Sequence, residues 1–405
     1  MPLLRRLVFA CAAFLLMWPL VLYPCVLWCI KRLRPASGPP IPRTGPPPSI
    51  TVIVPTYNEI SNIVPRLENI AVCDYPRDRL QVIVVDSASP DGTADAAEAF
   101  AGAHGDLQLS VLREAKRGGK AAATNYALNH CATDLVLVTD APTRFDPQAL
   151  AHIVRCFDDP EVGAATGRFM IFEQKTATQR EEGLFWHIRN VLRNLEADVD
   201  STPFLSGEFC CFRRELVQAI DTDSIADDMN AALQVRRQGR RAVVEPRALF
   251  TEPRSPDVGD LLVRKVSRAA GGVQELLRHR DMMFRPRYGL FGMLILPSAM
   301  LYYLPLRVPA LGVIAAALWP VARRHTAPLA AGAMVVAALP PLRRRVVDVL
   351  YVAALNEWLF VRGWHTVLAK QTEVLWEQEQ RSVVPQAGWT AAAAHDATSA
   401  KQPAR

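Results

Sequence analysis

The chain has 405 residues, about half of them hydrophobic, and a formal net charge of +6 at pH 7. Soluble domains usually contain more charge, so this composition favours a membrane-associated protein. The basic residues gather beside apolar stretches and do not alternate with aromatic residues, which argues against nucleic acid as a partner. The eight cysteines show no zinc-type spacing, and we expect reduced thiols.

An almost uncharged apolar run over residues 7–30 is long enough to cross a hydrocarbon core ~30 Å thick. It is followed by Lys31, Arg32 and Arg34, a positive flank of the kind that stays on the cytoplasmic side. We therefore predict an N-terminal transmembrane segment with its positive flank over residues 1–34. A cleaved signal peptide is the alternative, but the run is long for one and no small-residue cleavage site follows it.

Two prolines inside this run, Pro19 and Pro24, leave a second arrangement open, in which the segment bends into a re-entrant hairpin. The Pro-rich stretch 35–48 predicts a stiff linker. Because the positive flank precedes this linker, we expect an integral protein of the cell or inner membrane whose next domain lies in the cytoplasm, with the lipid bilayer as a partner.

From residue 49 onward, short continuous apolar runs alternate with helical stretches. Such runs are typical of strands buried on both faces of a parallel sheet, and their alternation with helices predicts a doubly wound α/β fold. In such sheets, ligands bind at the carboxyl ends of the strands. The expected strands are 49–55, 81–86 and 135–140, and the expected helices are about 59–72, 93–103 and 119–130.

Polar residues follow each strand end, in the sequences PTYNE (55–59), DSASPDGT (86–93) and TDAP (139–142), and KRGGK lies at 116–120. A carboxylate at a strand end can accept a hydrogen bond from a base or a ribose, and a Gly-Gly-Lys turn that opens a helix offers N–H groups and a cation to a diphosphate. A single Asp after a strand is more often a turn or helix cap. The four segments together predict a nucleoside-diphosphate pocket.

The motifs VPTYNE, VVDSASPDGT, GGKAAATNYAL and VLVTDAPTRFDP closely resemble those of the inverting glycosyltransferases of family 2, which have the GT-A fold. The resemblance covers about residues 49–275, and the flanking apolar segments are similar to the branch that includes cellulose, chitin and hyaluronan synthases. It implies a GT-A, Rossmann-like nucleotide-sugar-binding domain over residues 49–258, flanked by transmembrane helices.

The resemblance also implies a role for individual residues in binding the donor, most often a UDP-sugar. Lys120 would lie near the ribose or diphosphate, and Asp140 would open the D-x-D motif that binds Mg²⁺ or Mn²⁺. Pro142 stands where the second Asp of that motif is expected, so Asp140 would rely on the substrate diphosphate to complete the metal shell. The residues implied for the nucleoside are Pro55, Thr56, Glu59, Asp86 and Asp91.

Two later segments resemble the acceptor side of the family. Gly207 and Glu208, in the sequence FLSGE, match a turn near the sugar, and Asp227 and Asp228 match a carboxylate pair whose second member is the catalytic base. Inversion requires the acceptor hydroxyl to attack the anomeric carbon opposite the leaving diphosphate, and a carboxylate on that side can remove the proton. We therefore predict Asp228 as the base, with Asp227 beside it.

Processive synthases carry a Q-x-x-R-W motif, and the matching stretch 263–269 departs from it. Arg264 replaces the Gln, Arg268 retains the Arg and Ala269 replaces the Trp. Both arginines would pair with the diphosphate, or form a basic face on anionic lipid. Without the Trp platform we expect limited transfer to a lipid-linked or glycan acceptor; a processive polysaccharide synthase and a non-catalytic, degenerate transferase acting as a membrane partner are the alternatives.

The remaining segments complete the expected organisation. Residues 259–287 would form an amphipathic segment at the membrane interface, residues 288–361 two to four transmembrane helices, and residues 362–405 a partly disordered tail. Trp186 lies in a helical stretch in which apolar residues at this spacing are expected to pack rather than to bind a ligand.

Overall fold

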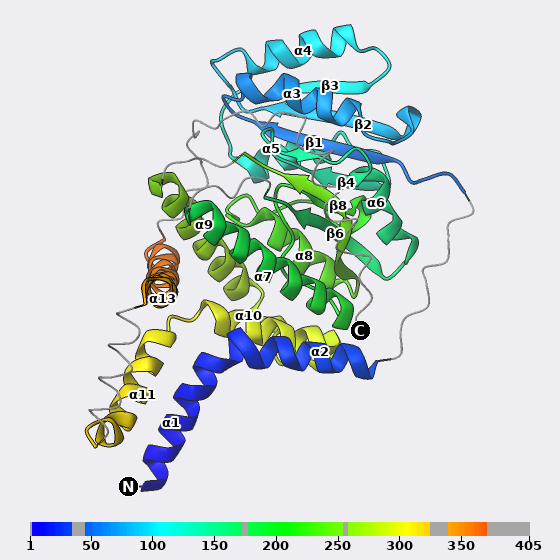
Figure 1. The fold of residues 1–405 in the computed structure, drawn as a ribbon. Coiled ribbons are helices and arrows are strands. Elements are labelled where there is room, and N and C mark those ends of the chain that lie inside the picture. Colours follow the sequence, from blue (N-terminus) through cyan, green and yellow to red (C-terminus); the bar gives the residue numbers. More distant parts are fainter. Residues whose placement is uncertain (1, 35–44, 172–176, 254–257, 325–338, 371–405) are drawn as a thin grey trace.

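The computed structural model describes residues 2–34, 45–171, 177–253, 258–324 and 339–370. A mixed eight-stranded sheet with the order β3-β2-β1-β4-β7-β6-β8-β5 lies at its centre (Figure 1). The strands are β1 (Ile50–Thr56), β2 (Leu80–Asp86), β3 (Gln108–Arg113), β4 (Leu135–Val138), β5 (Arg144–Phe145), β6 (Val162–Phe169), β7 (Cys210–Arg213) and β8 (Arg241–Thr251).

The first half of the sheet confirms the doubly wound pattern. Strands β3, β2, β1 and β4 are parallel, and β1 is buried on both faces because its β-branched side chains alternate between two cores. One core lies under α3 (Ile60–Ala71), α4 (Thr93–Ala103) and α6 (Ala149–Arg155). The other lies under α5 (Lys120–Leu128) and α8 (Asp227–Arg237). The carboxyl ends of β1 and β4 thus meet the start of α5 at one edge.

The second half corrects the expectation of a parallel sheet. Strand β7 runs antiparallel to both β4 and β6, and β5 runs antiparallel to β8, whereas β6 and β8 are parallel. Strands β5 and β7 are short, and β6 reads VGAATGRF, whose small residues give no continuous apolar run. Their places are set by pairing with distant strands rather than by local sequence.

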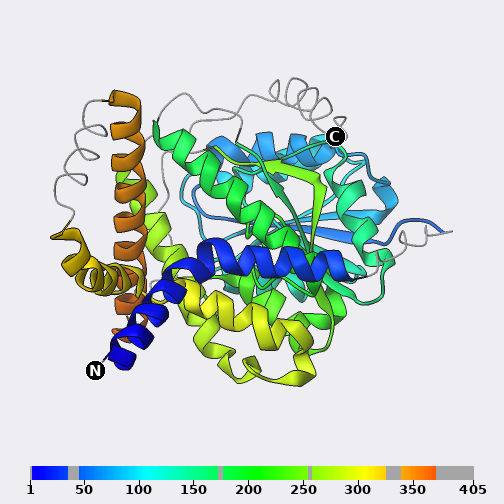
Figure 2. The same ribbon diagram turned by 60° about the horizontal axis from the view of Figure 1, so that its bottom comes forward.

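A third core joins the sheet to the N- and C-terminal helices. It contains residues of α2 (Tyr23–Leu33), α7 (Ala177–Val199), α9 (Val258–Arg278), α10 (Leu296–Tyr303) with the preceding π-helical turn Phe291–Ile295, and α13 (Pro340–Leu368). Helix α2 lies along α7, where the Tyr23 hydroxyl donates a 2.8 Å hydrogen bond to Glu196, and both views show this packing (Figures 1 and 2).

The N-terminal apolar run forms two helices rather than one. Helix α1 (Pro2–Met17) is separated from α2 by a π-helical turn over Trp18–Leu22, and α1 turns away from the body, where it lies beside α11 (Arg307–Ala322). Pro19 lies within this turn and Pro24 lies at the start of α2. A proline removes a backbone donor and crowds the preceding turn, which accounts for the break. The run over residues 7–30 is thus not one continuous helix but two helices joined by a π-helical turn.

Over the described ranges, no single helix is both long and apolar enough to cross a membrane. One bent pair, Phe291–Tyr303 with Arg307–Pro320, reaches that length together, with an angle of 79° between its two parts. The expected tail also begins later than residue 362, since α13 continues to Leu368. Three parts of the expected organisation lie outside the described residues: 35–44 of the linker, 325–338 of the expected transmembrane region 288–361, and the tail beyond 370.

Candidate active site

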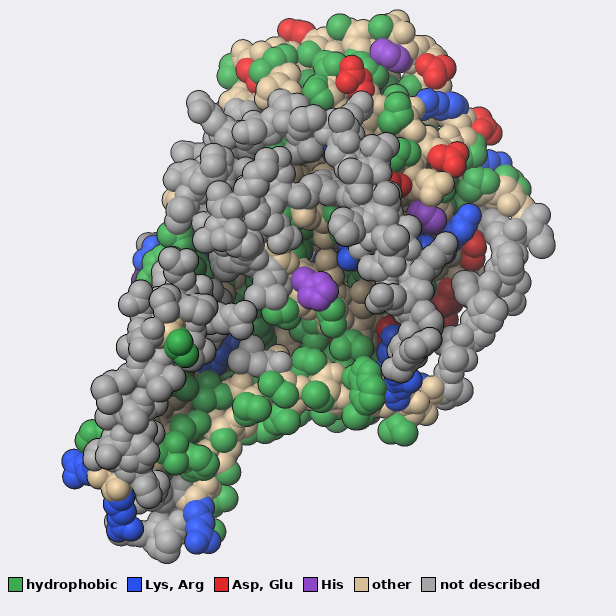
Figure 3. All heavy atoms as spheres, viewed as in Figure 1, with side chains coloured by type: hydrophobic (Ala, Val, Ile, Leu, Met, Phe, Trp, Pro, Cys, Tyr) green, Lys and Arg blue, Asp and Glu red, His purple; other side chains and the backbone are tan. Residues whose placement is uncertain are grey.

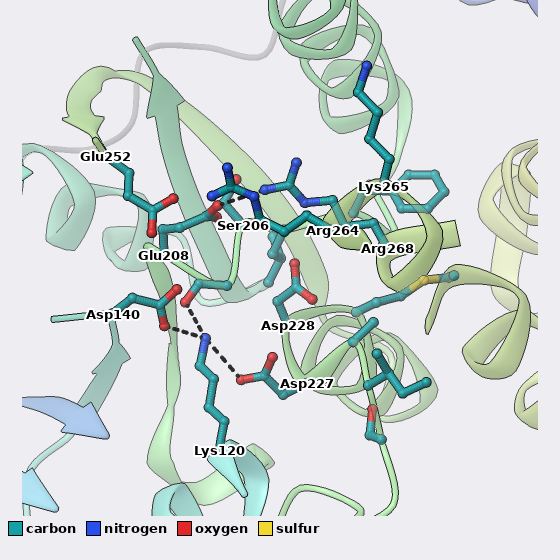
Figure 4. Close-up of a pocket in the computed structure, with 18 of the residues that line it drawn as sticks. Lys120, Asp140, Ser206, Glu208, Asp227, Asp228, Glu252, Arg264, Lys265 and Arg268 are labelled. Carbon is teal, nitrogen blue, oxygen red and sulfur yellow. Dashed lines mark hydrogen bonds and ion pairs between the residues drawn. The ribbon is translucent and has the colours of Figure 1, made fainter. Parts of the chain in front are cut away.

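A cavity of about 360 Å³ lies at the edge predicted from the strand ends. Its walls come from the carboxyl ends of β1 and β4, the first residues of α5 and α8, the turn before β7, and the inner faces of α7, α9, α10 and α13. Side chains from distant parts of the chain converge there (Figure 4). Of the residues predicted for the site, the cavity is lined by Pro55, Thr56, Glu59, Lys120, Asp140, Gly207, Glu208, Asp227, Asp228, Arg264 and Arg268.

Lys120 lines this cavity and contacts three other segments of its wall. Its ammonium group is 2.7 Å from Asp140 Oδ1 and 3.5 Å from Asp227 Oδ2, and it donates a 2.9 Å hydrogen bond to the carbonyl oxygen of Gly207 (Figure 4). Burial alone lowers the pKa of Lys120, but Asp140 and Asp227 raise it above its usual range, so the side chain stays charged. It is the first residue of α5, and Gly119 before it has a φ of +89°, which favours glycine.

The loop that carries Asp140 rests on a buried arginine from α3. Arg66 donates hydrogen bonds to the Thr143 carbonyl oxygen and to Thr139 Oγ1, both at 3.0 Å. Thr139 Oγ1 in turn donates to the backbone oxygen of Glu208 at 2.8 Å. Burial lowers the pKa of Arg66 to about 9, because the low dielectric disfavours its charged form. Both sides of the cavity are therefore fixed to one hydrogen-bonded network.

Asp228, the second residue of α8, also lines the cavity. Burial and the neighbouring Asp227 raise its pKa to about 7, while Lys120 and a hydrogen bond from the Met229 backbone act in the opposite direction. A carboxyl group with a pKa near the working pH is suited to accept a proton in the transition state. The structure thus gives the predicted base an environment that matches its task.

Two of the predicted donor residues lie outside the cavity lining. Asp91 accepts hydrogen bonds from the backbone N–H groups of Thr93, at 3.0 Å, and Ile60, at 3.1 Å, and so caps the starts of α4 and α3. Asp86 accepts a 3.0 Å hydrogen bond from the Ser89 backbone through one oxygen, while its other oxygen is buried and has no partner among the described residues. Asp86 therefore lies beneath the cavity wall rather than in the lining.

The two arginines of α9 enter the cavity from the side opposite Lys120 (Figure 4). Arg268 Nη2 lies 3.5 Å from Glu208 Oε1, and its guanidinium group lies 5.4 Å from the centre of the Trp186 ring. Arg264 is buried beside it and also lines the cavity. Positive groups therefore line both sides of the cavity, where a diphosphate has space to bind.

Sequence reasoning missed the contribution of α7 and α10. Trp186, Arg189 and Arg193 of α7 line the cavity, Arg193 donates a 2.7 Å hydrogen bond to Ser206 Oγ, and Arg189 stacks 3.9 Å above the Phe204 ring. The signal was present, because positions 186, 189 and 193 have the spacing of one helix face. Tyr303 of α10 had no such signal, since only the fold brings it to this wall.

The missing Trp at position 269 has a structural cause. Helix α13 approaches α9 at Gly363, where an added Cβ would lie 3.0 Å from the Ala269 Cβ. One turn further along α9, an added Cβ on Gly272 would lie 2.6 Å from the Tyr303 ring. This face of α9 is made of small residues because α10 and α13 occupy the adjoining space, so a Trp side chain has no room there.

The described residues include no cluster of three or more His, Cys, Asp and Glu side chains able to hold a metal ion by themselves. Asp140 nevertheless directs a hard carboxylate oxygen into the cavity (Figure 4). Mg²⁺ and similar ions are often bound by one or two carboxylates together with substrate phosphates. The donor set therefore fits a divalent ion that binds with a nucleoside diphosphate.

A Rossmann-like sheet whose strand ends, Gly-Lys turn and paired carboxylates surround one cavity defines a nucleotide-sugar-binding protein of the GT-A type. Residues 46–285 match the profile of the family described as "Glycosyltransferase like family 2". The match covers more than half of the chain, which therefore belongs to this family and is a glycosyltransferase.

Individual relatives agree with this assignment. The chain is 26% identical over 234 residues to the poly-beta-1,6-N-acetyl-D-glucosamine synthases of Staphylococcus aureus (strain COL) and Staphylococcus epidermidis, which is 56% of this chain and 56% of each relative. It thus spans about half the length of these relatives. The solved mannosyltransferase PcManGT from Pyrobaculum calidifontis, in complex with GDP-Man and Mn²⁺, is 32% identical with a TM-score of 0.69, covering 90% of this chain and 99% of that one.

The pKa of Asp228 predicts a stability effect with a definite sign. The pKa of Asp228 in the folded state lies above the unfolded value of ~3.9, so folding favours the protonated form of this carboxyl group. The contribution of Asp228 to the stability of the fold is therefore lost as the pH rises from about 4 through 7. We expect Asp228→Asn, which stays neutral, to raise the Tm by a few degrees at pH 8, and this gain to vanish near pH 4.

Thermal unfolding of the purified protein across this pH range measures the effect. Asp227→Asn is the matched control, and it should lower the Tm at pH 8 because it weakens the contact with Lys120. A Tm for Asp228→Asn at pH 8 equal to or below that of the wild type would contradict the assigned environment.

Proposed function

We propose that the chain transfers a sugar, with inversion, from a nucleoside diphosphate donor to a hydroxyl group of a membrane-associated or lipid-linked acceptor. One observation carries this proposal: a single cavity holds a carboxyl group with a raised pKa, Asp228, together with the cation Lys120 and the carboxylate Asp140. Inverting transfer needs both a base on the acceptor side and positive charge on the leaving-group side.

In this mechanism Asp228 accepts the proton of the acceptor hydroxyl as its oxygen attacks the anomeric carbon. Such general base catalysis contributes ~10²–10⁴-fold in rate. Glu208, which lies beside Asp228 and forms an ion pair with Arg268, is placed to orient the acceptor hydroxyls by hydrogen bonds. Asp227, the residue before Asp228 in α8, forms an ion pair with Lys120 and so keeps the base close to this cation.

On the donor side, Lys120, Arg264 and Arg268 neutralise the charge that develops on the departing diphosphate. A divalent ion held by Asp140 and the diphosphate would supply additional Lewis-acid stabilisation when bound. The end of β1, at Pro55 and Thr56, lines the cavity and is placed to receive the nucleoside.

For the donor we propose a UDP-sugar, as the sequence motifs predict. GDP-mannose is the second candidate, because the solved mannosyltransferase that aligns with 90% of this chain carries GDP-Man. The metal we propose is Mn²⁺ or Mg²⁺, and that neighbour is in complex with Mn²⁺.

Release of nucleoside diphosphate from a panel of UDP- and GDP-sugars tests the reaction. Membranes containing the wild type should release the diphosphate from one donor, and Asp228→Asn should reduce the rate at least ~100-fold because the base is lost. The folded Asp95→Asn variant, altered at an exposed ion pair on α4, is the control and should keep wild-type activity. Equal rates for the wild type and Asp228→Asn would refute the assigned base.

For the location we propose attachment to the lipid bilayer, with the sheet domain on the cytoplasmic side. Helices α1 and α11 project from the body side by side, and hydrophobic side chains gather on this part while basic residues lie at its tip (Figure 3). Leu3 and Leu4 are 70% and 67% exposed, and Trp319 of α11 is 57% exposed. Large apolar side chains in such number are costly in water but suit a hydrocarbon environment.

Membrane attachment predicts that the full chain sediments with membranes after an alkaline carbonate wash. Replacing Leu3, Leu4 and Leu7 with Asp should shift much of the protein to the soluble fraction, since each substitution puts a charge in lipid. The control variant carries Glu98→Asp, Glu114→Asp and Glu215→Asp, all on the sheet domain, and it should stay in the membrane pellet. Full release of the wild type by carbonate would rule out an integral attachment.

For the extent of transfer we propose one or a few sugars per acceptor. The face of α9 where processive relatives carry a Trp platform is filled here by α13 at Gly363 and by Tyr303. The alternative of a processive polysaccharide synthase draws support from the poly-N-acetylglucosamine synthases, which match over about half their length.

Product analysis separates these two outcomes. With the active donor in radiolabelled form, we expect one discrete glycolipid that partitions into the organic phase and appears as a single band on thin-layer chromatography. The Asp228→Asn membranes provide the blank. A high-mass labelled polymer retained in the aqueous phase would establish processive synthesis instead.

A further inference from the structure

We propose that Lys120 keeps free divalent cations out of the site at Asp140, so that the metal enters only together with the nucleoside diphosphate. This inference rests on the proposed function insofar as that function supplies the diphosphate. It concerns the order of binding, which neither the fold nor the family match determines.

The geometry at Asp140 is that of an occupied cation site. The Lys120 ammonium has three N–H bonds, and three oxygens surround it: Asp140 Oδ1 at 2.7 Å, the Gly207 carbonyl oxygen at 2.9 Å and Asp227 Oδ2 at 3.5 Å. A carbonyl oxygen and two carboxylates from three separate segments are also the ligand types that a hard metal ion prefers. The ammonium group therefore takes the ligands that an entering metal ion would need.

A metal ion and the ammonium cannot share these ligands without a penalty. An ion such as Mg²⁺ binds carboxylate oxygen at about 2.1 Å, which would bring it close to an ammonium that already lies 2.7 Å from Asp140 Oδ1. Two cations on one carboxylate repel each other strongly in a partly buried site. Pro142 offers no second carboxylate to offset this repulsion, because it has no polar side chain.

A diphosphate removes the conflict. Its negative oxygens supply the missing metal ligands and a new partner for the ammonium, so Lys120 can leave Asp140 and still be paired. Gly207 leaves room for the ammonium group where it now lies, because an added Cβ there would be only 3.1 Å from Lys120 Nζ. Metal and donor then bind as one unit, and the same lysine stays beside the leaving group.

Mn²⁺ binding to the purified full chain, followed by electron paramagnetic resonance without nucleotide, tests this inference. Lys120→Met keeps the length of the side chain but removes its charge, and we expect it to bind free Mn²⁺ at least about tenfold more tightly than the wild type. Lys120→Arg keeps the charge and should bind as weakly as the wild type. Adding Asp140→Asn to Lys120→Met should abolish the gain.

Either of two results would overturn the inference: Lys120→Met binds free Mn²⁺ no more tightly than the wild type, or the wild type itself binds Mn²⁺ equally well with and without UDP or GDP. Lys120→Gln replaces the Met variant if circular dichroism shows that the latter is unfolded. Because this assay needs no turnover, its outcome is independent of the donor panel: an inactive chain can still show the gain, and an active chain can fail to show it.

Discussion

The ion-pair network of Lys120 is the interaction on which the rest of the site depends. Asp140 follows β4, Gly207 lies in the turn before β7, and Asp227 begins α8, so one ammonium group joins three segments that are far apart in sequence. The carboxylates of Asp140 and Asp227 repel each other unless a cation lies between them. Without it, this repulsion would act against the hydrogen bond from Thr139 to Glu208, which also joins the loop of Asp140 to the turn before β7.

The helices around the sheet domain complete the same site instead of serving only as attachments. Tyr303 of α10 forms part of the cavity wall, and its carbonyl oxygen accepts a 3.0 Å hydrogen bond from Trp364 of α13. On the other side, α2 holds α7 through the hydrogen bond from Tyr23 to Glu196, and α7 carries Trp186 and Arg193 to the cavity. The positions of these helices therefore determine part of the cavity wall.

The sequence predicted the parts of the fold that are encoded locally. Strands β1, β2 and β4 are continuous apolar runs, and the helices between them end close to the expected residues, so the edge that carries Thr56, Lys120 and Asp140 was predictable. Strands β6, β7 and β8 depend on pairing between distant segments, and the small residues of β6 give no periodic signal. Tyr303 was missed because it reaches the cavity only through the packing of distant segments. The sequence also did not distinguish the capping of α3 and α4 by Asp91 from a role in donor binding.

The two departures from the family motifs each have a counterpart elsewhere in the molecule. At Ala269, where the family motif has a Trp, Gly363 of α13 packs closely against α9, and Tyr303 packs against the nearby Gly272. At Pro142, where the family motif has a second Asp, the loop is held by Arg66, which donates hydrogen bonds to Thr139 and Thr143 on either side. Lys120 neutralises the remaining carboxylate, Asp140. Both departures therefore lie in closely packed or hydrogen-bonded surroundings, at Ala269 through the neighbouring helices and at Pro142 through the anchored loop.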